Sequence, residues 1–241
     1  MSIADKLTQI AENQQKVFEA GKQAEYDRFR DTFQQNGNRT DYGYAFRGDT
    51  WTDDIFNPKY DIVPNTYGVQ MFHLSSITRL ASKLKELGVK LDTSKCNSFL
   101  QMFQSSSIKD IPELDGSNCN SLSYTFGSGA KVETIEKLIL TEKLTVVANA
   151  FRQASNLKHC IFDGVLAITG LDMKDCTLLD KESIISLVNI LSTTTSGLAV
   201  TLSLQAVNKA FETSEGANDG SNSTEWQTLV NTKKNWTVNL S

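Results

Sequence analysis

The residue types that form common metal and catalytic sites, such as histidine and cysteine, are few in this sequence. Its 241 residues include two histidines, three prolines and four cysteines, and no cysteines form a CxxC or CxxxC pair. A zinc site is therefore not expected, because such sites take closely spaced ligands. No apolar run approaches the ~20 residues that cross a bilayer. The polar start, MSIADKLTQIAENQQ, is not expected to be a secretory signal peptide.

Positive charge is not in excess either. Lys and Arg number 24 against 28 Asp and Glu, a formal net charge of −4. Without a basic stripe, binding to nucleic acid is disfavoured. Hydrophobic and charged fractions of 39% and 22% are ordinary for a soluble protein.

The sequence does contain a short motif that occurs twice, which we call the phrase. Residues 91–103 read LDTSKCNSFLQMF and residues 114–126 read LDGSNCNSLSYTF, with matches at one offset of 23 residues. Periods of about 20–30 residues are typical of stacked repeats, each of which buries its apolar face against the next. We therefore predict that Phe103, Phe126 and Phe151 stack as one ladder, with Phe72 in an atypical first repeat or a cap.

The same phrase places the cysteines. Cys96 and Cys119 occupy the same position in the two copies of the phrase. Cys176 occupies that position in a degenerate third copy, LDMKDCTLL (171–179). Cys160 begins a strand-like run, residues 160–162, that matches residues 138–140. Because free cysteine behaves as a small hydrophobe, we predict four buried, reduced thiols that bind no metal.

The phrase, with Ala150-Phe151 and the following Ser-Asn-Leu, resembles the BspA-like leucine-rich repeats over roughly residues 69–178. The phenylalanine spacing is uneven, and an insertion at residues 78–90 predicts a short amphipathic helix. The resemblance implies an α/β solenoid, a short right-handed stack of leucine-rich-repeat coils. We expect four parts: an N-terminal amphipathic helix (1–36), an aromatic, proline-containing extended arm or hairpin (37–68), the solenoid (69–178) and an α/β cap (179–241).

The two flanks carry their own patterns. Residues 3–34 predict one helix, ending near Gly37, that either packs on the body or forms a coiled coil and so a homo-oligomer. Residues 179–241 predict a helix capped by Asp180, then strand, helix, helix and strand. The helix predicted at residues 3–34 has an apolar seam at a/d spacing, formed by Ile3, Leu7, Ile10, Val17 and Ala24.

The aromatic residues of the arm allow two interpretations. Pro58 and Pro64 exclude a long helix there. The aromatic side chains form either the apolar face of a capping hairpin or a surface that binds sugar or peptide. They are Tyr42, Tyr44, Phe46 and Trp51.

No catalytic, cofactor-binding or metal-binding set is predicted. His159 and Cys160 are strand neighbours and point to opposite faces, so they cannot form a nucleophile pair, and His73 merely adjoins Phe72. The Gly127-Ser-Gly129 run lacks the Lys-Ser/Thr of a phosphate loop. The acidic pair Asp172 and Asp175 and the sequons at Asn38, Asn222 and Asn235 are interpreted as solvated turn residues and chance matches.

In arrangement, the N-terminal helix, the WTDDIFNPKYDI stretch and the NWTV ending resemble proteins encoded among tail and minor structural genes of phages and prophages of gut Firmicutes. This resemblance implies a displayed, non-enzymatic adhesion or recognition module for a protein or glycan ligand, in the virion or in the bacterial cytoplasm before assembly. The alternatives are a bacterial surface adhesin or a carbohydrate- or peptidoglycan-active tail enzyme. Such an enzyme needs two carboxylates across a cleft, and the candidates are Asp53, Asp54, Asp61 and Glu113.

Overall fold

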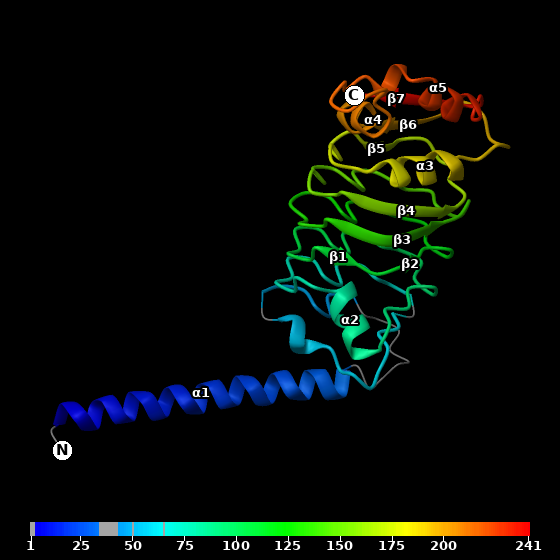
Figure 1. Ribbon diagram of the computed structural model, residues 1–241. Coiled ribbons are helices and arrows are strands. Elements are labelled where there is room, and N and C mark those ends of the chain that lie inside the picture. The colour runs from blue at the N-terminus through cyan, green and yellow to red at the C-terminus, as the bar shows by residue number, and fades with distance from the viewer. Residues whose placement is uncertain (1–2, 34–42, 50, 65) are drawn as a thin grey trace.

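The computed structural model describes residues 3–33, 43–49, 51–64 and 66–241 of the chain. It is an elongated body from one end of which a single long helix, α1 (Ile3–Phe33), projects (Figure 1). The C-terminus lies at the other end of the body. Of the described helices, none is both long and apolar enough to cross a bilayer.

A parallel sheet of four strands lies along one side of the body. Its strands are β1 (Asp110–Ile111), β2 (Leu114–Asp115), β3 (Thr134–Leu140) and β4 (His159–Gly164). Both β1 and β2 pair with β3, which also pairs with β4. The register places Ile111, Ile135 and Cys160 side by side, and all three are buried. The strand-like runs predicted at residues 138–140 and 160–162 are confirmed as parts of β3 and β4.

A second parallel sheet of three strands lies nearer the C-terminus, in the order β5 (Leu171–Met173), β6 (Leu198–Leu202), β7 (Trp236–Leu240). Parallel strands need crossover connections, which contain α3 (Lys181–Ile190), α4 (Leu204–Ala210) and α5 (Thr224–Asn231). Side chains cap all three helices, because Asp180, Ser203 and Ser223 each accept a hydrogen bond from a first-turn N–H. The predicted order of elements and the Asp180 cap are confirmed.

The remaining helices are short. The insertion at residues 78–90 forms α2 (Ala81–Leu87), which ends at Gly88 in a left-handed conformation. Two 3-10 turns are η1 (Asp53–Ile55) and η2 (Gly220–Asn222). The described residues of the arm contain no hairpin, which leaves the extended arm of the two predicted forms: Ile62 and Tyr67 make single parallel bridges to later segments.

The structure corrects the predicted fold class. The described residues form a mixed α/β fold with one four-stranded and one three-stranded parallel sheet and five α-helices, not a leucine-rich-repeat solenoid. The repeats are too unequal to build identical coils. Within the described ranges, strands of five or more residues form only at β3, β4, β6 and β7. The helix α2 interrupts the first segments, and the C-terminal third builds its own sheet with helical crossovers.

The phenylalanine ladder is confirmed, and it is longer than predicted. The ring centroids of Phe72 and Phe103 are 5.3 Å apart, those of Phe103 and Phe126 are 5.8 Å apart, and those of Phe126 and Phe151 are 5.0 Å apart. Phe46 adds a further ring, 5.1 Å from Phe72. All five rings are almost fully buried, so the ladder forms the centre of the core.

Among the side chains of α1 that the structure describes, Tyr26 and Phe29, near its C-terminal end, contact the body. Phe29 stacks on Trp51 at 4.2 Å, and the Tyr26 hydroxyl lies 3.1 Å from the Thr52 hydroxyl. The predicted seam does not take part, since Ile10 is 52% and Val17 is 73% exposed. The interpretation that the seam packs on the body is therefore wrong for these residues. The predicted helix end at Gly37 and the Ile3 and Leu7 side chains lie outside the described part of the chain.

Candidate functional site

The four carboxylates proposed for catalysis divide into two groups. Asp53 accepts hydrogen bonds from the Thr78 backbone N–H (2.7 Å) and hydroxyl (2.9 Å) and from the Arg79 backbone N–H (3.1 Å). Burial acts to raise the Asp53 pKa, but these bonds and the Arg79 charge lower it overall. Asp54 pairs with Lys83 at 2.9 Å. These two carboxylates hold the arm against the body.

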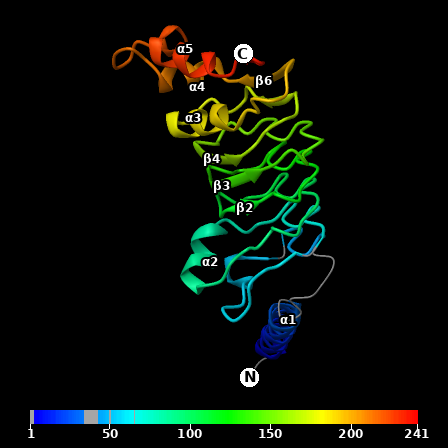
Figure 2. The same ribbon diagram turned by 90° about the vertical axis from the view of Figure 1, so that its right-hand side faces the viewer.

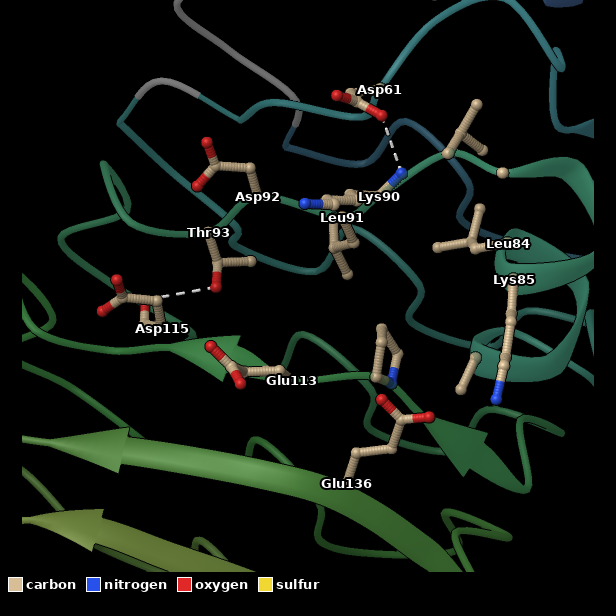
Figure 3. Close-up of a pocket in the computed structure, with 14 residues that line it drawn as sticks. Asp61, Leu84, Lys85, Lys90, Leu91, Asp92, Thr93, Glu113, Asp115 and Glu136 are labelled. Carbon is tan, nitrogen blue, oxygen red and sulfur yellow. Dashed lines mark hydrogen bonds between the residues drawn. The ribbon is translucent and has the colours of Figure 1, made fainter.

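Asp61 and Glu113, by contrast, line one groove beside α2 (Figure 3). The groove has a volume of about 810 Å³ and a floor of apolar side chains that includes Leu84 and Leu91. It exists because α2 bulges from the body while the neighbouring segments carry no helix. Its rim combines two lysines with five carboxylates: Lys85, Lys90, Asp61, Asp92, Glu113, Asp115 and Glu136.

Most of the groove's carboxylates are already engaged within the fold. Asp61 accepts from the Lys90 backbone N–H at 2.8 Å, and Glu113 pairs with Lys137 at 3.1 Å. Asp92 and Asp115 each accept from the backbone N–H two residues later, at 3.0 and 2.8 Å. The Ser94 hydrogen bonds lower the Asp92 pKa, which keeps that carboxylate ionised at neutral pH. Asp61 and Glu113, two of the four carboxylates proposed for catalysis, thus line the same acidic groove.

The aromatic residues of the arm mostly serve the core. Phe46 ends the ladder, and Trp51 packs on α1, as expected for a cap. Tyr44 differs: it is 54% exposed, with the Arg47 guanidinium 5.4 Å from its ring centroid. Tyr42 lies outside the described residues. Of the described aromatic residues named for a binding surface, Tyr44 is the one most available to a ligand.

A surface that the sequence reasoning missed lies around Tyr44. Two residues before and two residues after each ladder phenylalanine, the backbone is left-handed, with φ between 50° and 89°. Neighbouring segments hydrogen-bond in register here; for example, the Gln70 N–H donates to Leu100 O and the Tyr124 N–H donates to Ala148 O. We call this surface the turn face. It comprises Tyr44, Gly48, Gln70, Leu74, Gln101, Ser105, Tyr124, Ser128, Asn149 and Gln153.

Left-handed backbone is unfavourable for residues with a Cβ, at roughly 1–2 kcal/mol per residue, and glycine avoids that penalty. The chain uses glycine at one of the ten turn-face positions, Gly48, and keeps larger side chains at the other nine. Such strain persists where the surrounding structure enforces it, and it concentrates at functional sites. The side chains of the turn face are therefore candidates for a role that glycine could not fill.

The two long sides of the body differ in charge. On the strand side, Glu133 pairs with Lys158 at 2.6 Å and with Lys109 at 3.7 Å. The turn face carries no charged residue at its ten positions. Next to it, His73 has its pKa lowered by burial and by the Arg47 charge, so it is neutral at neutral pH. Figure 2 shows β2, β3 and β4 along one side of the body and strand-free segments along the other.

Polar atoms beside and within the turn face have unused hydrogen-bonding capacity. Gln70 Nε2 donates to Gln101 Oε1, which links two neighbouring segments. Among the described residues, however, Gln70 Oε1, His73 Nδ1 and Gln104 Oε1 are buried and have no hydrogen-bond partner. Buried polar atoms of this kind are uncommon and call for an explanation.

His159 and the four cysteines have structural roles. His159 Nδ1 lies 2.6 Å from Asp180 Oδ2, while Cys160 points into the core. Burial would raise the Asp180 pKa, but the hydrogen bonds from Ser183 and His159 lower it overall. As predicted, all four cysteines are buried free thiols.

The cysteines lie in two pairs of neighbours. Cys96 lies near Cys119, and Cys160 lies near Cys176, which follows β4 in the segment of the second sheet. Burial raises the pKa of Cys96 to about 12 and of Cys119 to about 11, so these thiols are poor nucleophiles.

Other motifs are absorbed by the fold. A Cβ on Gly127 would lie 2.7 Å from Asn149 O, so glycine there permits a close backbone approach. Asp172 accepts from Lys174, and Asp175 accepts from the Gln153 backbone N–H. The described residues contain no group of three or more His, Cys, Asp or Glu side chains arranged to hold a metal ion.

No protein-family model, curated protein or solved structure matches this chain. Its resemblance to BspA-like repeats and to tail-associated proteins therefore stays a prediction.

Proposed function

We propose that this protein is a non-enzymatic recognition module that binds its ligand through the turn face. One observation carries the proposal. Nine of the ten left-handed positions keep a side chain, although Gly48 at the tenth shows that glycine can occupy such a position. Purely structural positions would tolerate glycine. Retained amide, hydroxyl and tyrosine side chains at strained positions favour contact with a partner.

We propose further that α1 joins copies of the protein, which would display several turn faces together. The seam residues Ile10 and Val17 are exposed, and Phe18 beside them is 57% exposed. On a helix with 100° per residue, Val17 lies about 180° from Tyr26, which contacts the body. Docking to the body and pairing with a second α1 are thus compatible, and an apolar seam left in water favours pairing.

Display of this kind suits the tail-associated role implied by the sequence resemblance. Tail and lysis genes on both sides of the coding sequence would agree with that placement. A neighbourhood of unrelated metabolic genes would contradict it.

Adsorption to bacterial envelopes tests recognition. The labelled full chain is incubated with cell envelopes from a panel of Gram-positive gut bacteria, and the retained fraction is measured. The variant Tyr124→Gly/Asn149→Gly is designed to stay folded, because both residues have φ of 55°, which glycine adopts readily. We expect at least one envelope to retain the wild type and the variant to lose that retention.

A matched control excludes a general effect of glycine. Asn218 is also left-handed, with φ of 51°, but lies outside the turn face. Asn218→Gly should be retained like the wild type. Equal retention of all three proteins, or of none, would contradict the proposal.

The groove supplies the observation that favours the enzymatic alternative, since Asp61 and Glu113 both line it. Incubation with peptidoglycan and with glycoside panels tests this function. Turnover that is lost in Asp61→Asn and in Glu113→Gln would establish the enzyme and displace the recognition module. Absence of turnover in the wild type would remove this alternative.

A further inference from the structure

The chemistry of the turn face narrows the class of its ligand. Four of its nine side chains are amides, Gln70, Gln101, Asn149 and Gln153. An amide side chain offers two donors and an acceptor with two lone pairs on one planar group. Tyr44 and Tyr124 add ring surface and hydroxyls, and Ser105 and Ser128 add two further hydroxyls. A partner that fits this set is rich in hydroxyl groups and carries no net charge.

The buried amide oxygens next to this surface point the same way. Gln70 Oε1 and Gln104 Oε1 lie in neighbouring segments without partners among the described residues. Rotation of the Gln104 terminal amide would present a donor or an acceptor to a ligand at little conformational expense, whereas the Gln70 amide is held by its hydrogen bond to Gln101. Ligand hydroxyls, which both donate and accept, could use either orientation.

Two other ligand classes fit less well. Specific protein interfaces centre on an apolar, aromatic-rich patch, but the large apolar side chains exposed on the turn face are Tyr44 and Leu74 alone. Anionic ligands are held by clustered arginines or lysines, whereas none of the ten positions is charged and Arg47 lies over the Tyr44 ring at one end of the surface. The turn face is also long and regular, because its left-handed positions recur beside each of the five ladder phenylalanines.

From these observations we infer that the turn face binds an uncharged glycan chain that lies along the ladder direction. This inference rests on the proposed recognition function and specifies its ligand class. It predicts weak dependence on salt, because no ion pair forms in the complex.

An array of immobilised polysaccharides tests the inference on the full chain. Dextran, mannan and galactan represent neutral glycans, polygalacturonate and hyaluronate represent acidic ones, and chitosan represents a basic one. Dissociation constants are measured at about 0.05 M and about 0.5 M NaCl, since this range removes most screening-sensitive attraction. We expect binding to a neutral glycan, with less than about a twofold change between the two salt concentrations.

The glycine variants test whether the turn face is the binding site. Tyr124→Gly and Asn149→Gly should each weaken binding roughly five- to tenfold, as expected when about one hydrogen bond is lost. Asn218→Gly should leave the dissociation constant unchanged. Circular dichroism melting of each variant confirms that it is folded.

Three results would overturn the inference. Binding only to acidic or basic polysaccharides, with loss at high salt, would assign charge recognition. Equal binding by all glycine variants would place the site elsewhere. Envelope adsorption that depends on Tyr124 but is abolished by protease and not by periodate would identify a protein ligand; the recognition function would then stand while the glycan inference falls.

Discussion

Removal of one ring from the middle of the phenylalanine ladder should destabilise the protein strongly. Phe126 is 1% exposed and lies between Phe103 and Phe151, at centroid distances of 5.8 and 5.0 Å. Phe126→Ala would leave a cavity that the neighbours cannot fill easily. The backbone hydrogen bonds from Phe126 N–H to Ala150 O (2.9 Å) and from Phe103 N–H to Thr125 O (3.0 Å) hold the segments at their spacing.

The magnitude follows from this rigidity. Phe→Ala substitutions in cores cost about 3–5 kcal/mol, and sites that cannot collapse lie at the upper end of that range. Phe126→Leu keeps most of the apolar volume but loses both ring contacts, each worth about 0.5–1.5 kcal/mol. We therefore expect a loss of about 4–5 kcal/mol in the alanine variant and about 1–3 kcal/mol in the leucine variant.

Urea denaturation followed by circular dichroism measures both losses. The midpoint should fall while the slope m stays unchanged, because the substitution alters stability and not the surface exposed on unfolding. Leu178→Ala is the control, since Leu178 is 51% exposed and lies outside α1 and the turn face, so its loss should change stability by less than about 0.5 kcal/mol. If Phe126→Ala moves the midpoint no further than Leu178→Ala does, the ladder does not stabilise the core.

Three further predictions concern α1, a helix cap and a close backbone contact. Val17→Asp should convert a self-associated protein to monomer in light scattering, whereas Lys16→Asp, on a neighbouring position of the helix, should not; a monomeric wild type would refute the seam. Asp180→Ala should cost about 1 kcal/mol at pH 7 through loss of the cap. Because the Asp180 pKa is lowered in the folded state, its contribution is present above the ordinary carboxyl pKa of about 3.9 and is lost as the pH falls through the depressed value, so the variant's acid-unfolding curve should be flatter below about pH 4. Gly164→Ala should unfold the β3–β4 edge, since its Cβ would lie 2.1 Å from a backbone oxygen; Gly170→Ala, with nearly the same φ (90° against 92°) and open space, should cost only about 1–2 kcal/mol, and equal effects would disprove the steric argument.

Local patterns in the sequence determined many elements correctly. The recurring phenylalanines specified a stacked core, because one apolar residue per segment can be buried only against its counterpart in the next. The apolar spacing at residues 78–90 and the Asp180 cap predicted α2 and the start of α3, since helix periodicity and capping depend on residues within a few positions of one another. The burial of the cysteines followed in the same way from their place in the phrase.

Other features depended on contacts between distant segments, which no local pattern encodes. The fold class was predicted wrongly because unequal spacings between phenylalanines leave room for α2 and for a second sheet with helical crossovers. The groove arises because α2 lies beside strands that carry no helix, so that Asp61 and Glu113, which are distant in the sequence, line the same groove. The turn face could have been suspected from the fixed positions two residues on either side of each phenylalanine, but left-handed backbone at glutamine, leucine and tyrosine is imposed by hydrogen bonds between neighbouring segments. Tertiary structure alone decided that these side chains gather on one neutral surface.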